Sequence, residues 1–366
     1  MECKEKKQMN CSIITIHHIH NFGSVLQAYA LYRFLKDNGY NVQTIDYRPP
    51  YYDSGKNSLK THLGKLLNLR AYHTRKKKFE RFIREYNRLT ERSFASLEAL
   101  ASAYKNDRDL FIAGGDQLWN NYHPCGNDDA YKLTFTQGKK LAYGTSMGRD
   151  NFEESELAAL GKKVDDFSHV MLREAITVPM LAPYTKANVS HVIDPVGLLN
   201  PEHFKQIAKK PDIKESYAVM YLSDAGEVLD AAIEHLSQKM GLKIVHICGF
   251  RKKCYCDLFE KSAGPEEILG YILYADFVLS ASFHATMFSL LFNKEFATLL
   301  PGAKTNARIE DVLKNVGLAH RILHTVDDLG ELDRTIDFTE ANHRIAALRE
   351  RSAQMLLDAL VALSKE

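Results

Sequence analysis

The sequence predicts an α/β fold in two halves, each made of strands that alternate with helices. The chain has 366 residues, which is more than one small core requires and fits two domains. Short apolar runs such as Phe277-Val-Leu-Ser280 are typical of strands that are buried on both faces. Stretches with helical spacing follow these runs, and this alternation favours parallel sheets.

The expected elements divide the chain into an N-terminal domain over residues 10–200, a C-terminal domain over 213–330 and a final amphipathic helix over 334–366. Residues 200–215 are expected to connect the domains, and the final helix is expected to pack back across both. Ser24 is expected to cap the first helix, with Gln27 completing a capping box. The expected strands cover residues 11–17, 42–46, 109–113, 217–222, 243–247, 277–280 and 296–299, and two more begin at 141 and 170.

Composition indicates a soluble globular protein. Apolar residues make up 45% and charged residues 26% of the chain, and no apolar run is long enough to cross a bilayer. The charged start lacks the apolar core of a signal peptide, so we expect a cytoplasmic protein. Six scattered cysteines show no paired zinc spacing, so free thiols and no metal site are expected.

Residues 56–92 form a strongly basic stretch, with twelve Lys or Arg against three Glu. Phe79, Phe82, Ile83 and Tyr86 follow helical spacing within it, which predicts an amphipathic helix with a cationic outer face. The favoured interpretation is a solvated helix that docks through its aromatic stripe. A functional interpretation is that this helix contacts an anionic membrane surface peripherally, at the inner face of the membrane. No RNA-binding motif or zinc finger is present, so no nucleic-acid partner is expected.

Candidate functional residues follow the expected strands at the edge of the sheet where ligands bind in open α/β folds. Ser282 and His284 come after strand 277–280, where the histidine can cap the turn or bind an anion. Asp116 follows Gly114-Gly115 and can act as a base or belong to a simple turn. Asn21 and Gly23 lie in the loop after the first strand, where they touch substrate or only make the turn.

Two cations complete this candidate set. Arg173 stands at a strand end and can bind a carboxylate or a phosphate, or form a salt bridge with Glu174. Lys304 follows strand 296–299 and can reach the same edge as His284. A cleft with these residues would be cationic with one carboxylate, which fits transfer of a small anionic group to a hydroxyl acceptor. The chain has no P-loop and no dinucleotide-binding glycine motif.

Four segments together resemble the polysaccharide pyruvyl transferases. They are Asn21-Phe-Gly-Ser-Val-Leu-Gln-Ala-Tyr-Ala-Leu31, Gly114-Gly-Asp-Gln-Leu-Trp-Asn120, Gly264-Pro-Glu-Glu-Ile-Leu269 with Ser282-Phe-His284, and Asn306-Ala-Arg-Ile309. Two positions depart from the family pattern: Gly115 stands where many members have Ser, and Ala285 where Gly is common.

The resemblance implies a GT-B-like fold, with two Rossmann-like domains that face a cleft. It implies a transferase of polysaccharide biosynthesis, for a capsule or exopolysaccharide, that uses phosphoenolpyruvate as its donor substrate and no cofactor. The acceptor would be a sugar in a glycan or in its lipid-linked precursor, and the product a pyruvate ketal with release of phosphate. Arg173, His284 and Lys304 match the residues that family members place around phosphoenolpyruvate, and Asp116 is our candidate base.

Two other functions remain open at this stage. One is a GT-B glycosyltransferase that uses a nucleotide sugar, because function lies in the site and both classes share the fold. The other is a non-catalytic module that binds a membrane surface through the basic helix. The sequence leaves open the acceptor sugar, the position and stereochemistry of the ketal, the oligomeric state, and which residues are the general acid and base.

Overall fold

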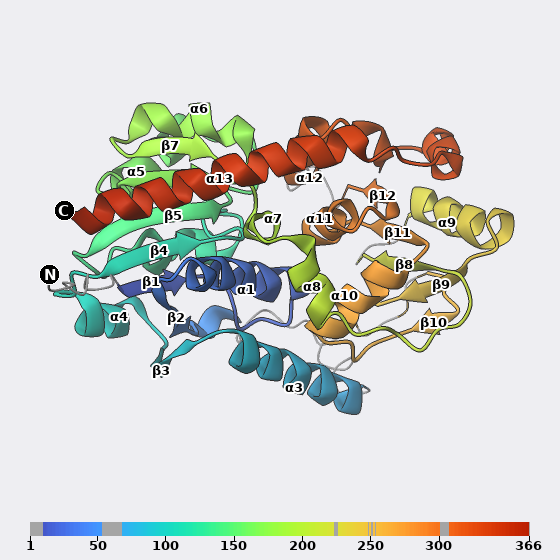
Figure 1. Ribbon diagram of the computed structural model, residues 1–366, viewed down its shortest axis with the longest axis horizontal. Helices are drawn as coiled ribbons and strands as arrows, with labels where there is room; N and C mark the ends of the chain where they lie inside the picture. The colour runs from blue at the N-terminus through green and yellow to red at the C-terminus, as the bar shows by residue number, and fades with distance from the viewer. Residues whose placement is uncertain are drawn as a thin grey trace, which may run out of the picture.

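The structure is a computed structural model that describes residues 10–52, 68–222, 226–247, 249, 252, 254–300 and 307–365. Within these residues the chain forms two parallel sheets, of seven and six strands. The two sheets lie beside each other, each flanked by helices (Figure 1). The predicted α/β fold of two Rossmann-like domains is therefore confirmed.

The first sheet has the strand order β3-β2-β1-β4-β5-β6-β7. Its central strands β1 and β4 pair in parallel, with Ile13 opposite Ile112, and β4 is buried along its whole length. Burial on both faces explains why these strands read as continuous apolar runs in the sequence. The strands are β1 (Asn10–Ile14), β2 (Asn41–Tyr47), β3 (Leu89–Phe94), β4 (Leu110–Gly114), β5 (Lys139–Thr145), β6 (His169–Leu172) and β7 (Asn188–His191).

The second sheet has the order β10-β9-β8-β11-β12-β13, and its neighbouring strands pair in parallel. Its two end strands, β10 and β13, are two residues long and were not predicted from the sequence. The strands are β8 (Tyr217–Tyr221), β9 (Lys243–His246), β10 (Leu258–Phe259), β11 (Phe277–Ser280), β12 (Glu295–Leu299) and β13 (Ile322–Leu323).

Helices connect the strands and cover both sheets (Figure 1). In the described part of the chain none of them is both long and apolar enough to cross a membrane. They are α1 (Phe22–Asp37), α3 (Leu69–Tyr86), α4 (Leu97–Tyr104), α5 (Glu154–Lys163), α6 (Val178–Leu181), α7 (Pro195–Leu198), α8 (Pro201–Ile207), α9 (Glu227–Glu234), α10 (Pro265–Tyr274), α11 (Phe283–Leu291), α12 (Ala307–Asn315) and α13 (Thr339–Lys365).

The order of the strands fixes where a ligand can bind. In the first sheet, successive strands are added in one direction from β1 to β3 and in the opposite direction from β4 onward, so the order switches between β1 and β4; in the second sheet it switches between β8 and β11. Ligands bind outside the carboxyl ends of the strands at such switch points. The segments that follow β1 and β4 carry Asn21, Gly23 and Asp116, and the segment that follows β11 carries Ser282 and His284, with Gly23 and His284 in the first turns of α1 and α11.

An aromatic core joins the two domains. Phe22 of α1 meets Tyr221 of β8 edge-to-face, with ring centroids 4.6 Å apart. Phe204 of α8 meets Phe288 of α11 at 5.0 Å, also edge-to-face. These rings belong to one continuous hydrophobic cluster that contains residues of both sheets. Large buried aromatic contacts of this kind hold two surfaces in a fixed relation.

Helix α13 runs along both domains and ends beside the first sheet (Figure 1). At one end the Arg344 guanidinium donates to the Asn315 carbonyl at 3.2 Å. Further along, the Ser352 hydroxyl accepts a hydrogen bond from the backbone N–H of Ile193 at 2.9 Å. Lys139 of β5 donates to the Leu363 carbonyl near the end of the helix.

One local prediction was wrong, and two elements were not predicted from the sequence. Helix α1 begins at Phe22 because the Asn21 side chain caps it, so Ser24 lies inside the first turn. The connector contains helix α8, which Asn200 caps by accepting from the N–H of Glu202. Strand β3 overlaps the end of the basic stretch. Its extended backbone is set by pairing with β2 and not by a period-2 pattern of side chains.

Candidate active site

Asp116 lies in a strained turn after β4. Its φ is 52° and that of Gly115 is 65°, both in the left-handed region. The carboxylate accepts a 2.5 Å hydrogen bond from the Ser24 hydroxyl of α1 and a 2.8 Å bond from the N–H of Gln117. Burial alone would raise the pKa of Asp116, but His284, Arg173 and the Ser24 hydroxyl outweigh it and hold the pKa below its usual value. The side chain is therefore ionised at neutral pH.

Arg173 is buried at the end of β6 between two carboxylates. Its Nη1 lies 2.7 Å from Asp194, and its Nε lies 3.3 Å from Glu174. Burial lowers the pKa of Arg173, but Asp194, Glu174 and Asp116 raise it further, so the group stays charged. The guanidinium carbon also lies 4.2 Å from the ring centre of Phe283 on α11, which ties the first domain to the second.

These carboxylates change the expected charge of the site. The sequence predicted a cationic cleft with one carboxylate, and this was wrong. Asp116, Glu174 and Asp194 all lie around Arg173. The sequence analysis did not select Asp194, and it considered Glu174 only as a possible salt-bridge partner for Arg173. Among the described residues, the arginine charge is thus balanced before any ligand binds.

His284 lies in the first turn of α11 and is buried at 6% exposure. Its Nε2 is 3.7 Å from Asp194, which is longer than a hydrogen bond. Burial lowers the pKa of His284, and the nearby Arg173 and Arg308 lower it further, against the opposing effect of Asp194 and Asp116. The imidazole is therefore neutral at pH 7 in the unliganded protein.

Gly23 and His284 form a close contact between the two domains at this site. A Cβ atom on Gly23 would lie 2.1 Å from Nδ1 of the imidazole. No side chain larger than hydrogen fits there unless the histidine moves. Gly23 therefore serves the site through its small size, and its N–H donates to the Asn21 cap at 3.0 Å.

Arg308 is a further cation of the site that the sequence analysis did not select. It stands at the start of α12, and its guanidinium carbon lies 5.8 Å from the ring centre of Phe283. Burial and the nearby Arg173 lower the pKa of Arg308 to about 10, so it remains charged at neutral pH. The signal was present, because Arg308 belongs to the Asn306-Ala-Arg-Ile309 segment of the family resemblance.

Three buried nitrogens of this cluster lack a hydrogen-bond partner among the described residues. They are Nη2 of Arg173, Nε of Arg308 and Nε2 of His284. Buried polar groups are normally paired, so unmet donors grouped around one aromatic ring indicate a place for an acceptor. An oxyanion is the acceptor that guanidinium groups bind best.

The remaining predicted site residues have other positions or lie outside the structure. The Ser282 hydroxyl caps α11 by accepting from the N–H of Ala285 at 3.5 Å, and Asn21 caps α1, so both support the loops at the site. Lys304 lies outside the described residues. Within the described ranges, no group of three His, Cys, Asp or Glu side chains is arranged to hold a metal ion.

We predict that Gly23→Ala destabilises the protein through His284 and not through the helix. Overpacking a core position costs about 1–3 kcal/mol of unfolding free energy, whereas Ala in place of Gly inside a helix otherwise stabilises by about 1 kcal/mol. In a His284→Ala background the cost should vanish or change sign. Denaturant unfolding of the two single variants and the double variant measures this coupling.

Gly330→Ala is the matched control, because nothing lies within 4 Å of a Cβ at that position. Its effect should be equal in both backgrounds. Equal costs of Gly23→Ala with and without the imidazole would show that Gly23 and His284 are not in contact.

Comparison with known proteins supports this fold and places the chain in a family. The UDP-N-acetylglucosamine 2-epimerase from Rickettsia bellii is 10% identical, with a TM-score of 0.54 over 98% of this chain and 97% of that one. An Arabidopsis thaliana glycosyltransferase complexed with UDP-L-rhamnose is 11% identical, with a TM-score of 0.51 over 98% and 99%. At such identities these structures show the GT-B fold alone. The search of curated proteins found no match.

A family model described as polysaccharide pyruvyl transferase matches residues 21–301. This range covers most of the chain and includes three of the four segments, and the fourth, Asn306-Ala-Arg-Ile309, lies just beyond it. The chain belongs to the polysaccharide pyruvyl transferase family.

Proposed function

We propose that the protein transfers the enolpyruvyl group of phosphoenolpyruvate to hydroxyls of a sugar, in a polysaccharide or its lipid-linked precursor. The product is a pyruvate ketal, and phosphate is released. The observation that supports this most is the group of three unpartnered donors on Arg173, Arg308 and His284. Family membership supports the reaction class, and the donor set fits a small acid phosphate.

Phosphoenolpyruvate carries a carboxylate and a phosphate, so its site must supply several donors. Nη1 and Nε of Arg173 are held by Asp194 and Glu174, which orient the guanidinium and leave Nη2 free. Arg308 adds a second guanidinium on the same aromatic ring. We assign Lys304 a further contact with this donor, as the family resemblance implies.

The reaction balances with one proton delivered and two removed. Protonation of the donor methylene gives a methyl group and makes the central carbon electrophilic. A sugar hydroxyl adds to this carbon and loses its proton, the bond to phosphate breaks, and a second hydroxyl of the same sugar closes the ketal. Ketal formation thus breaks two O–H bonds; one proton ends in the methyl group and one leaves with phosphate or solvent.

His284 and Asp116 fit the acid and base roles in this scheme. A phosphate dianion beside the imidazole favours its charged form, which reverses the effect of burial and makes His284 a proton donor. Asp116 is ionised and can accept the hydroxyl proton, while the Ser24 hydroxyl and the N–H of Gln117 fix its orientation. The two groups come from different domains, and the contact between the domains already brings them close enough to influence each other's pKa.

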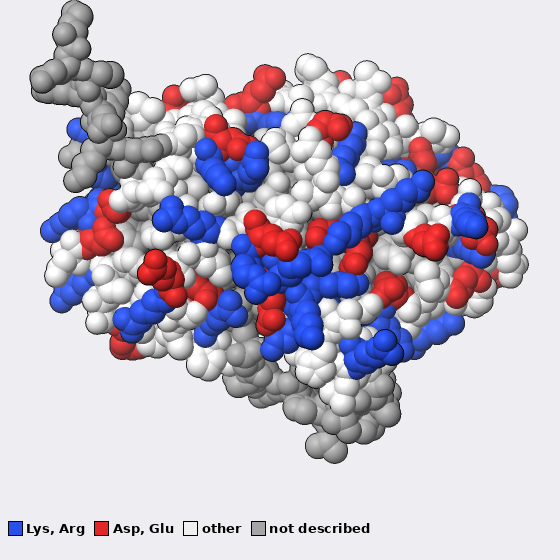
Figure 2. Space-filling model, turned by 60° about the horizontal axis from the view of Figure 1, so that its bottom comes forward, with Lys and Arg blue, Asp and Glu red and all other residues white. Residues whose placement is uncertain are grey.

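Membrane contact through α3 is the second part of the proposal, since a lipid-linked acceptor would lie at a membrane. Lys and Arg side chains gather at the centre of the face on which α3 lies, with acidic side chains among them (Figure 2). Some of this charge is paired: Lys78 with Glu267 at 2.8 Å, and Arg81 with Glu266 at 2.9 Å. Lys77 and Arg84 are exposed on α3, and no ion pair engages either one among the described residues.

We predict that phosphate release from phosphoenolpyruvate in the presence of a sugar acceptor requires His284. His284→Ala should lower the rate by about 100-fold or more, because general acid catalysis contributes on this scale. A coupled phosphate assay over a panel of lipid-linked and nucleotide-linked sugars measures it, with circular dichroism as the control for folding.

The same assay separates the alternative function. A GT-B glycosyltransferase would release UDP from a nucleotide sugar such as UDP-N-acetylglucosamine and leave phosphoenolpyruvate intact. A His284→Ala enzyme with full activity would show that the imidazole takes no part in the chemistry.

We also predict that the protein binds vesicles containing anionic lipid more strongly than neutral vesicles. The double variant Lys77→Glu/Arg84→Glu should weaken this binding, because each basic residue near such a surface contributes about 1 kcal/mol. Cosedimentation at two salt concentrations measures it. Lys162→Glu/Lys186→Glu, on exposed positions elsewhere in the first domain, is the charge-matched control. Equal losses for both pairs would assign the binding to net charge and not to α3.

A further inference from the structure

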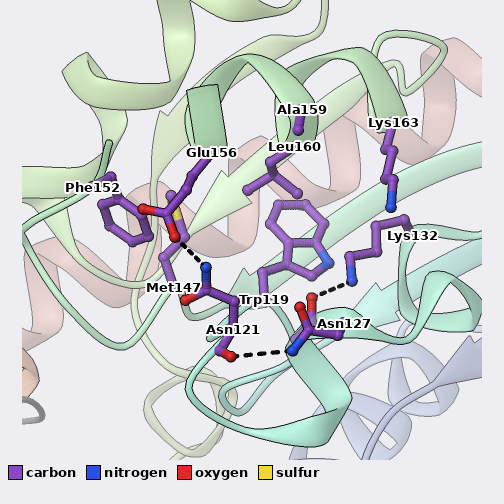
Figure 3. Close-up of a pocket in the computed structure, with 11 residues that line it drawn as sticks. Trp119, Asn121, Asn127, Lys132, Met147, Phe152, Glu156, Ala159, Leu160 and Lys163 are labelled. Carbon is purple, nitrogen blue, oxygen red and sulfur yellow. Dashed lines mark hydrogen bonds between the residues drawn. The ribbon is translucent and has the colours of Figure 1, made fainter. Parts of the chain in front are cut away.

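A second hollow of the first domain lies beside the turn that carries Asp116. It is a cavity of about 220 Å³ between helix α5, the segment after Asp116 and the segment after β5 (Figure 3). This is room for a single sugar ring and not for an oligosaccharide. The mechanism above uses none of its side chains.

One side of the cavity is apolar. The indole of Trp119 stands between Leu160 of α5 and the turn below it, and Phe152 and Met147 lie across the opening (Figure 3). The indole Nε1 donates to the Tyr131 carbonyl at 2.9 Å, which fixes the plane of the ring. Trp119 itself is only 3% exposed, so the apolar surface that a ligand can touch comes mainly from the half-buried Phe152 and Leu160. Such a surface suits the apolar face of a pyranose.

The opposite side carries two ammonium groups. Lys132 is 3% exposed, and its Nζ donates to the carbonyls of Gly126 at 2.6 Å and Asp128 at 3.0 Å. A lysine has three donors, so one N–H remains. No carboxylate forms an ion pair with Lys132 in the described part of the chain. Lys163 reaches down from α5 toward the same side and pairs with Asp129 at 2.6 Å (Figure 3).

The carboxylates near Lys132 do not offset its burial. Burial lowers the pKa of Lys132 to about 8, and Lys163 lowers it as well, although Asp129 and Asp128 oppose them. A buried cation in this condition gains from an anion placed next to it.

The far end of the cavity is held rigid by a polar network. Arg149 donates to the Asn121 side chain at 2.8 Å and to Glu156 at 2.7 Å, and Asn121 donates to Glu156 at 2.5 Å. The Arg149 guanidinium stacks 4.0 Å from the ring centre of Phe152. The cavity is therefore formed before any ligand arrives, which lowers the cost of binding.

The cavity is connected to the Arg173 cluster through the backbone. Met147 lines the cavity, and its N–H donates to Glu174 at 3.2 Å. Glu174 in turn holds Arg173. Trp119 is three residues beyond Asp116, and its backbone N–H donates to the Ser146 carbonyl at 3.2 Å. A hydrogen-bonded chain through Met147 and Glu174 thus links this cavity to Arg173 of the candidate active site.

We propose that this cavity is a subsite for one sugar of the acceptor glycan, and that this sugar carries an acidic group which faces Lys132 and Lys163. The apolar side of the cavity, with Phe152 and Leu160, takes the apolar face of the ring, and the two ammonium groups take the acid. The proposal rests on the proposed function only in assigning this sugar to the acceptor glycan. Binding of the sugar itself requires no reaction with phosphoenolpyruvate.

Trp119 is the one tryptophan of the sequence, so tryptophan fluorescence reports on this cavity directly. The probes are D-glucuronate, D-glucose and inorganic phosphate, each titrated into the full-length protein with excitation selective for tryptophan. We expect a saturable change with D-glucuronate, an affinity at least about tenfold weaker for D-glucose, since a charge-assisted hydrogen bond is lost, and no saturable change with phosphate.

Two pairs of variants provide the controls. Ala159 lines the cavity and Ala158 does not, so Ala159→Phe should abolish the response and Ala158→Phe should leave it unchanged. Lys163→Met should weaken D-glucuronate binding by about tenfold, and its neighbour Lys162→Met should not. All four positions are exposed, so folding should be retained and is checked by thermal unfolding.

Each other outcome overturns the proposal. Equal affinity for glucose and glucuronate would show that the site does not recognise an acidic group. An equal response to phosphate would show that the cavity binds free anions. A response that survives Ala159→Phe would show that the sugar binds elsewhere. Glucuronate binding without phosphate release from phosphoenolpyruvate would leave the sugar site standing and refute the proposed reaction. Phosphate release without glucuronate binding would do the reverse.

Discussion

The contact between Gly23 and His284 is the constraint on which the site depends. The backbone of α1 in the first domain reaches the imidazole of α11 in the second so closely that no Cβ fits between them. The aromatic core of Phe22, Tyr221 and Phe288 lies behind this contact and holds it in place. Groups from two sheets can act on one molecule only where such a contact fixes their distance.

The charge of the site follows from the same packing. Arg173 would be costly to bury alone, and Asp194 and Glu174 offset that cost. This pairing also fixes the direction of Nη2, which has no hydrogen-bond partner among the described residues. The two carboxylates therefore position a donor in addition to neutralising the charge of Arg173. The balance explains how a cluster of cations can be stable without ligand and still hold unmet donors for an anion.

The fold could largely be read from the sequence, because its strands are buried on both faces and its helices follow at regular intervals. Strand β11 and the turn to α11 were predicted closely for this reason. Short edge strands such as β13 carry too few residues to show a period. Ser24 was misassigned as a cap because its hydroxyl is used by Asp116, which lies 92 positions further along the chain.

The site was only partly predictable. Strand ends located Asp116, Arg173 and His284, since parallel strands bring their carboxyl ends to one edge. The sequence did not show that Asp194 turns back onto Arg173, because that depends on how β6 and the segment after β7 pack together. Arg308 was missed because its place in the site depends on how α12 packs near Phe283, which the sequence alone does not show.

The most direct test of a two-domain anion site is a crystal structure of the protein with phosphoenolpyruvate bound. We predict that the carboxylate and phosphate oxygens lie within hydrogen-bond distance of Arg173 Nη2, Arg308 Nε and His284 Nε2, between the two sheets. A ligand bound to one domain alone, away from these three nitrogens, would contradict that description of the site.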